Sequence, residues 1–217
     1  MRLFGGICAV LLLSLTWAFD FPFFEKQILA RFGPARLVLL REWQASLVDA
    51  RKSAELEKLR KVNDFINQHV EFDEDLSIYN YSDYWATPLE TVGHGRADCE
   101  DFAIIKYFSL KDSGVAISKL RLVYVKARLE EAGGPRLQAH MVLAYYATPN
   151  AEPLVLDNLV PEILPASQRK DLHPVFSFNS EAVWNGVAGN SVKGKGGTGQ
   201  LSRWQDLLLR ARKEGFD

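Results

Sequence analysis

Cysteine is scarce in this chain, and its scarcity limits the kinds of protein that the sequence can encode. Only two cysteines, Cys8 and Cys99, are present among 217 residues. Cys8 lies in an N-terminal segment that we interpret as cleavable, so the mature chain keeps Cys99 alone. A single cysteine has no intramolecular partner, which excludes a disulfide framework and indicates a free thiol.

Long apolar runs are also lacking after the N-terminus, so we expect no stable insertion into a membrane. Residues 1–18 carry the basic Arg2 near their start and an apolar run at 5–15. They end at 16–18 in a small-x-small pattern, which suits a cleavage site. That run is too short to span a bilayer and is typical of a secretory signal peptide. We predict export through this signal peptide, and a retained N-terminal anchor is the alternative.

No excess of charge of either sign is present. The 26 lysines and arginines oppose 27 aspartates and glutamates, and the formal net charge is −1. Such a balance gives no electrostatic attraction to nucleic acid or to an anionic membrane surface. The 47% of apolar residues and 24% of charged residues are ordinary for a globular protein with a sizeable core.

The lone cysteine lies where a glycine-containing loop is predicted to turn into a helix that ends at Gly114. Asp98 is a suitable N-cap, Asp101 three residues later makes a carboxylate variant of the capping box, and Cys99 takes the first helical position. The apolar residues of this segment recur at helical spacing, which predicts a helix of about three to four turns. We name them Phe102, Ile105, Phe108 and, beside them, Ser109.

Two opposing electrostatic effects act on the Cys99 thiol. The start of a helix favours the thiolate, because unpaired N–H groups and the helix dipole stabilise negative charge. The carboxylates of Asp98, Glu100 and Asp101 act in the other direction, because like charges raise the pKa of an acid. A hard divalent cation held by these oxygens would offset them, and Ca²⁺ is the first candidate. The alternative is an inert cysteine beside an aspartate cap.

The rest of the chain predicts an α+β fold, in which a helical N-terminal part packs with an antiparallel sheet. The segment 19–33 is expected to form an N-terminal strap or a short helix. Further helices are expected from 34 with Leu37 on its buried face, from 53 with Leu56 on its buried face, and from 88. Strands are expected at 120–127, 137–147 and 153–158, as an antiparallel meander, with one more at 175–178. A mobile loop at 187–199 precedes a last amphipathic helix at 201–213 that buries Trp204, Leu207 and Leu208.

We therefore predict one domain over residues 19–217. It divides into the helical part at 19–75, a catalytic core at 76–180, and the loop with the C-terminal helix at 181–217. The segment Gly189–Lys195 resembles a phosphate-binding loop, but Gly196 stands where a hydroxyl residue should follow and no strand precedes it. We assign no nucleotide site to it.

Three residues from separate elements can form a nucleophilic site. Cys99 opens a helix, His140 lies inside a predicted strand, and Asp157 ends the next strand. Neighbouring antiparallel strands can place His140 beside Asp157 on one sheet face, so that the imidazole is held by one nitrogen while the other faces Cys99. Each residue alone has a structural explanation: a buried histidine, a turn aspartate. Trp85 is either a core residue or part of the cleft wall.

At these positions the sequence resembles the bacterial transglutaminase-like cysteine proteinases, and among them the LapG-type periplasmic proteases. The resemblance lies in the segments 84–90, 95–103, 119–125, 139–142 and 155–158, and it extends over roughly residues 35–175. Ala97 stands where that family suggests a glycine. The ordered Cys, His and Asp set makes the resemblance specific.

This resemblance implies a papain-like or transglutaminase-like fold and a thiol protease in the periplasm. Cys99 would attack a peptide carbonyl, His140 would act as base and Asp157 would orient it. Asp98, Glu100 and Asp101 would bind Ca²⁺ together with backbone carbonyls. The substrate would be the N-terminal region of a large surface adhesin, whose release disperses a biofilm, and an inner-membrane receptor for cyclic di-GMP would inhibit the enzyme.

Two other functions are compatible with the same residues. A transamidase acting on cell-wall peptides would share the thioester and differ only in the acceptor. A non-enzymatic calcium-binding module would keep Cys99 for structural reasons alone.

Overall fold

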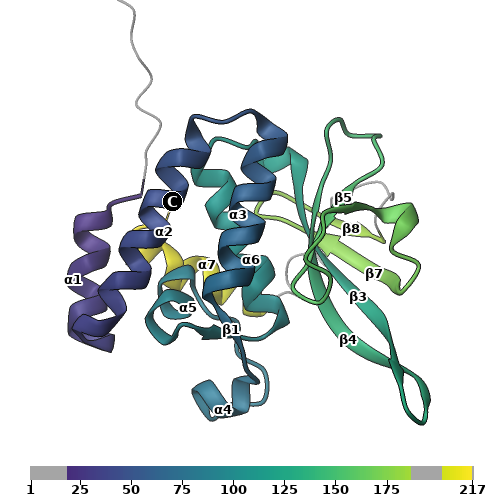
Figure 1. Ribbon diagram of the computed structural model, residues 1–217, viewed down its shortest axis with the longest axis horizontal. Coiled ribbons are helices and arrows are strands. Elements are labelled where there is room, and N and C mark those ends of the chain that lie inside the picture. The colour runs from purple at the N-terminus through teal and green to yellow at the C-terminus, as the bar shows by residue number, and fades with distance from the viewer. Residues whose placement is uncertain (1–18, 187–201, 217) are drawn as a thin grey trace, which may run out of the picture.

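The computed structural model describes residues 19–186 and 202–216. The predicted signal peptide, the predicted mobile loop and the segment Gly189–Lys195 lie outside these residues. A layer of helices packs against one face of a six-stranded antiparallel sheet, as Figure 1 shows. This is the α+β arrangement that the sequence predicts.

Most of the described helices precede the large sheet in the chain, two short strands lie among them, and one helix follows the sheet. The helices are α1 (Phe21–Phe32), α2 (Leu37–Arg51), α3 (Glu55–His69), α4 (Asp75–Tyr79), α5 (Pro88–His94), α6 (Cys99–Asp112) and α7 (Ser202–Glu214), with 3₁₀ turns η1 (Pro34–Arg36), η2 (Ile117–Lys119) and η3 (Ala166–Gln168). The strands are β1 (Glu71–Phe72), β2 (Arg96–Ala97), β3 (Leu120–Glu131), β4 (Gly134–Tyr145), β5 (Leu154–Leu156), β6 (Leu164–Pro165), β7 (Leu172–Phe178) and β8 (Val183–Asn185).

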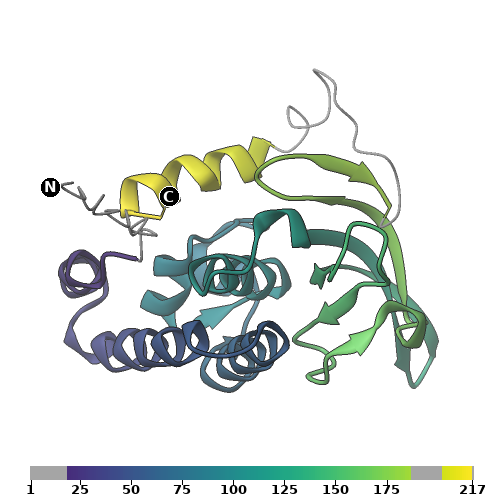
Figure 2. The same ribbon diagram turned by 90° about the horizontal axis from the view of Figure 1, so that it is seen from above.

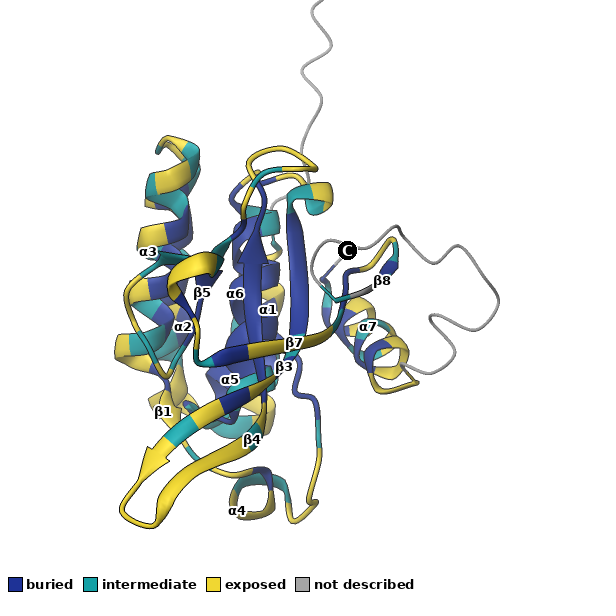
Figure 3. Ribbon diagram, turned by 90° about the vertical axis from the view of Figure 1, so that its right-hand side faces the viewer, coloured by how far each residue is buried: buried dark blue, intermediate teal, exposed yellow. Residues whose placement is uncertain are grey.

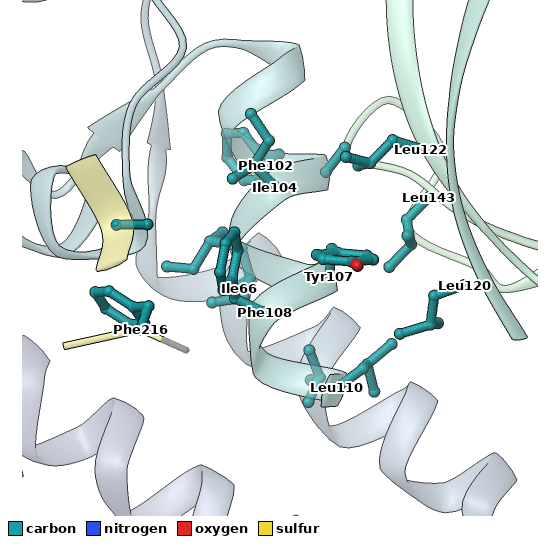
Figure 4. Packing of buried hydrophobic residues seen from close by; sticks show 14 of the residues in the cluster. Ile66, Phe102, Ile104, Tyr107, Phe108, Leu110, Leu120, Leu122, Leu143 and Phe216 are labelled. Atoms are coloured by element: carbon teal, nitrogen blue, oxygen red, sulfur yellow. The ribbon is translucent and has the colours of Figure 1, made fainter. Parts of the chain in front are cut away.

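Helix α6 occupies the centre of the molecule, between the sheet and the helices α2 and α3. Every residue from Asp101 to Leu110 is buried, which a helix shows when other elements surround it on all sides. In Figure 4, Tyr107 faces three leucines of the sheet, and Phe108 faces Phe216 near the C-terminus. The residues predicted from the apolar periodicity, Phe102, Ile105, Phe108 and Ser109, are all buried in it.

The large sheet has the strand order β6-β5-β4-β3-β7-β8. The predicted meander is confirmed as β3, β4 and β5, and the expected extra strand is β7, which pairs with β3. Strands β3 and β4 extend beyond the sheet as a long hairpin whose tip is exposed, as Figure 3 shows. The face of the sheet away from α6 buries a smaller apolar cluster of its own, which includes Val123, Val142 and Leu172.

The predicted buried faces of the N-terminal helices are mostly confirmed, with exceptions at their edges. Leu40, Trp43 and Leu47 of α2 are fully buried, but Leu37 is only partly covered. Leu56 is 53% exposed because it lies in the first turn of α3, where the helix leaves the core.

Helix α7 lies on the opposite side of α6 from α2 and α3, as Figure 2 shows. Its Trp204 is 2% exposed and contacts the rings of Tyr107 and Phe178, with centroids 5.7 and 5.5 Å away. Leu207 is buried as predicted, whereas Leu208 is only partly buried. Among the described residues, no helix combines the length and the apolar character that crossing a bilayer requires.

Trp204→Ala tests how far α7 stabilises this core. Removing a buried tryptophan should lower the free energy of unfolding by about 3 to 5 kcal/mol. Leu209→Ala on the same helix removes a side chain that is 58% exposed and should cost less than about 0.5 kcal/mol. Urea unfolding of both variants measures the difference, and equal costs would show that α7 is not part of the core.

Candidate active site

The start of α6 places the lone cysteine as the sequence predicts. Asp98 is the N-cap in an extended conformation, and its Oδ1 accepts the N–H of Asp101 at 3.3 Å. Cys99 is the first helical residue and its thiol is the free cysteine of the described chain. The capping box is incomplete, because the Asp101 carboxylate does not return to the cap. It accepts the N–H of Ala86 at 2.7 Å instead.

His140 and Asp157 meet as expected from the pairing of β4 with β5. Leu156, the last residue of β5, pairs with Leu143 of β4, so Asp157 emerges beside His140. Nε2 of His140 lies 2.8 Å from Oδ1 of Asp157, and the two residues are 3% and 2% exposed. Because Nε2 is engaged with the carboxylate, Nδ1 is the ring nitrogen left for a proton transfer.

A cleft of about 470 Å³ contains both Cys99 and His140 in its lining. Its aromatic wall includes Tyr124 and Phe176, whose stacked rings lie 5.4 Å apart on β3 and β7. The register of this strand pair shifts between Tyr124 and Val125, and such bulges commonly turn side chains toward a site. The nucleophile and the base predicted from sequence therefore share one cavity.

Trp85 combines the two roles between which the sequence could not decide. It lines the cleft, and its ring also stacks on Phe178 with centroids 5.7 Å apart. Nη2 of Arg210 on α7 donates to its carbonyl oxygen at 2.6 Å. The C-terminal helix therefore supports one wall of the cleft.

The Cys99 thiol is held in its protonated form in this arrangement. Its Sγ lies 2.7 Å from Oε2 of Glu100, to which the thiol donates. Burial, followed by the charges of Glu100 and Asp98, raises the pKa of Cys99, while the N–H of Met141 acts against this rise. The predicted effect of the acidic neighbours is thus confirmed, as a contribution second to that of burial.

Beside the cysteine, carboxylates converge from α4 and α6. One oxygen each from Asp75, Asp98 and Asp101 lie within 4.8 Å of one another, and one each from Asp75, Asp83 and Glu100 do the same. The three predicted metal ligands therefore lie in two overlapping groups. Asp75 belongs to both groups. The acidic turn at 71–75 has no residue spacing that indicates a metal site, so only the tertiary structure reveals Asp75 as a possible ligand.

These carboxylates are costly to bury without a cation. Burial and neighbouring charges raise the pKa of Asp98 to about 11 and that of Asp75 to about 6, and burial raises the pKa of Asp101 well above its usual range. Oδ2 of Asp101 and Oδ1 of Asp75 are buried and lack a hydrogen-bond partner. Unpaired buried oxygens from several carboxylates fit a hard divalent cation such as Ca²⁺.

Two further residues that the sequence did not suggest fix the backbone of Asp157. Its carbonyl oxygen accepts from Nζ of Lys106 at 3.0 Å and from Nδ2 of Asn67 at 2.8 Å. Burial lowers the pKa of Lys106 to about 7, although Asp157 and Asp64 act against it. Lys106 follows Cys99 by two helical turns, so the same face of α6 carries the nucleophile and contacts the aspartate. The sequence offered one sign of a role for Lys106, because a lysine within an apolar helical run is unusual.

Comparison with known proteins identifies the family of this chain. Residues 42–187 match the model of the bacterial transglutaminase-like cysteine proteinases. The chain belongs to this family. A search of curated protein sequences gives no significant match.

Solved structures of one family member superpose over most of the chain. LapG of Legionella pneumophila is 36% identical, covers 89% of this chain and 98% of its own, and has a TM-score of 0.72. Its EGTA-treated form gives 35% identity, the same coverages and a TM-score of 0.74. Its calcium-bound form gives 37% identity, coverages of 88% and 98%, and a TM-score of 0.71. The transglutaminase-like fold expected from the sequence is confirmed.

Asp101→Asn tests the cost of the buried carboxylates. In the presence of a chelator at pH 7, this substitution should raise Tm by about 3 °C or more, because 1 kcal/mol corresponds to about 2–4 °C in a chain of this size. The amide still accepts the Ala86 N–H but carries no charge to neutralise. The gain should shrink toward pH 4: a carboxyl whose folded pKa is raised destabilises the fold only above its unfolded pKa.

Differential scanning calorimetry of the chelated protein measures this effect. Glu42→Gln, at an exposed position of α2, is the matched control and should leave Tm unchanged. A lower Tm for Asp101→Asn in the chelator at pH 7 would contradict the repulsion.

Proposed function

We propose that this protein is a calcium-dependent cysteine endopeptidase in which Cys99, His140 and Asp157 form the catalytic triad. The observation that carries the proposal is the buried His140–Asp157 pair of 2.8 Å facing the cleft that Cys99 also lines. Membership of a cysteine proteinase family supports the reaction class.

The chemistry follows from the position of each side chain. Nδ1 of His140 takes the proton of Cys99, and Sγ attacks the carbonyl carbon of the scissile peptide to form a tetrahedral intermediate. The Cys99 N–H begins a helix, so it has no intrahelical acceptor and can donate to the oxyanion. His140 then returns the proton to the leaving amine, and a water hydrolyses the thioester. Asp157 fixes the imidazole throughout.

Calcium fits the acidic group beside the nucleophile. Asp98, Glu100 and Asp101 are the ligands proposed from sequence, and the position of Asp75 adds a fourth carboxylate. A bound cation supplies positive charge that offsets these carboxylates and thereby favours the thiolate. Glu100 is the acceptor of the thiol proton in the described structure, so a Glu100 carboxylate engaged with a cation holds the thiol less strongly. The existence of a calcium-bound form of the 37% identical LapG supports this assignment.

The finer parts of the proposal concern location, substrate and control. We place the enzyme in the periplasm after removal of the signal peptide at 1–18. We further propose that it cleaves the N-terminal region of a large surface adhesin and so promotes biofilm dispersal. An inner-membrane receptor for cyclic di-GMP would restrain it. These proposals rest on the resemblance to LapG-type proteases described above.

Cys99→Ala should abolish cleavage of a purified adhesin N-terminal fragment, because no other side chain in the cleft replaces the thiolate. Gel analysis with mass spectrometry identifies the products. Circular dichroism of the variant should match the wild type, which separates loss of chemistry from loss of fold. Retained proteolysis by folded Cys99→Ala would refute the thiol mechanism.

EGTA should suppress cleavage by the wild type, and added calcium should restore it. Asp75→Asn should raise the calcium concentration needed for half-maximal activity by about 10-fold or more, because it removes a charged oxygen from both carboxylate groups. Glu71→Gln, at an exposed position four residues before Asp75 and outside the cluster, is the control and should not shift it. Full activity of chelated, metal-free protein would exclude the calcium requirement.

Product analysis separates hydrolysis from transamidation. With a primary amine present in excess, a free carboxylate on the product supports the endopeptidase. Incorporation of the amine would instead support the transamidase.

A further inference from the structure

A buried arginine, Arg169, closes the side of Asp157 that faces away from His140. Oδ1 of Asp157 accepts from the imidazole and from the N–H of Leu159 at 3.1 Å. Oδ2 accepts from Nη2 of Arg169 at 2.7 Å. The side chains of Arg169 and Asp157 are 2% and 0% exposed. The two carboxylate oxygens are therefore divided between the imidazole and the guanidinium.

Arg169 is held independently of Asp157. Its Nε and Nη2 donate to the two oxygens of Asp171 at 3.0 and 2.7 Å, which is a bidentate pair. The carbonyl oxygen of Asp171 accepts the N–H of Arg128 on β3 at 2.8 Å, and the N–H of Leu172 donates to the carbonyl oxygen of Arg169 at 3.1 Å. Contacts other than the one with Asp157 therefore already hold the guanidinium against the sheet.

The charge of Arg169 is permanent, whereas that of His140 changes during a proton transfer. Burial would raise the pKa of Asp157, but the hydrogen bonds and charges of His140 and Arg169 outweigh it and lower the pKa to about 2. Without the guanidinium, a fully buried carboxylate would face only a neutral imidazole whenever His140 had given up its proton.

We propose that Arg169 is a positioning residue of the active site, which holds the carboxylate of Asp157 in the orientation that fixes His140. This inference rests on the proposed function, since it requires Asp157 to act on His140 during catalysis. A purely structural Arg169 would only tie the turn at 169–172 to the sheet. The two roles differ in whether the effect of Arg169 depends on Asp157.

Arg169→Met, which keeps the apolar stem and removes the guanidinium, should lower kcat by about 10- to 100-fold, as loss of a residue supporting a catalytic group commonly does. KM should change less than about 3-fold, because Arg169 lies behind the triad. Arg169→Lys should recover part of the loss, because a lysine keeps the charge but not the bidentate geometry. Cleavage of the adhesin N-terminal fragment in calcium measures both constants.

Lys170→Met is the matched control. It removes a positive charge from the next residue of the same turn, whose side chain is exposed, so kcat should stay within about 3-fold of the wild type if the contact of Arg169 with Asp157 is what matters. If Lys170→Met lowers kcat as much as Arg169→Met, the effect comes from the loss of charge in the turn and the proposal is wrong.

A double-mutant cycle with Asp157→Asn separates positioning from stability. Against this background, Arg169→Met and Arg169→Lys should change the residual cleavage rate, or the rate of Cys99 alkylation by iodoacetamide, by less than about 3-fold. If Arg169→Met lowers the rate by the same factor in the wild-type and the Asp157→Asn backgrounds, the proposal is overturned. Should Arg169→Met fail to fold in calorimetry, the Arg169→Lys cycle gives the same decision. Failure of the proposed function itself would appear differently, as a wild type that does not cleave or a Cys99→Ala variant that does.

Discussion

The packing of α6 between the sheet and the N-terminal helices is the contact on which the rest of the site depends. Its first turn carries Cys99 and its acidic neighbours, and two turns later Lys106 binds the carbonyl oxygen of Asp157. The opposite wall of the cleft comes from β4 through His140. Because both elements are buried and well packed, the nucleophile and the base are placed by the core and not by mobile loops.

That placement has an electrostatic cost. A helix start would normally favour a thiolate, yet burial and then the charges of Glu100 and Asp98 raise the pKa of Cys99, and Glu100 accepts the thiol proton. In the acidic cluster beside the thiol, one buried oxygen each of Asp75 and Asp101 has no hydrogen-bond partner. Both features fit the cation site proposed above, at which a bound ion would offset the carboxylates and favour the thiolate.

On the other side of the cleft, the charges are balanced within the protein. His140 and Arg169 donate to the carboxylate of Asp157, and the side chains of Lys106 and Asn67 donate to its carbonyl oxygen. An ionised carboxylate can be buried this completely only because each oxygen has its donors. The candidate site therefore combines a group of converging carboxylates with a carboxylate whose donors all come from the protein.

The sequence by itself determined the residues whose chemistry is local. A capping aspartate before an apolar run predicted the start of α6 and the position of Cys99, and the spacing of strands predicted that His140 would meet Asp157. It did not reveal Asp75, Arg169 or Asn67, which lie in ordinary acidic or polar segments and reach the site only when distant elements pack together. Local propensity and periodicity are written in neighbouring residues, whereas the partners of a buried charge are chosen by the tertiary structure that excludes water from it.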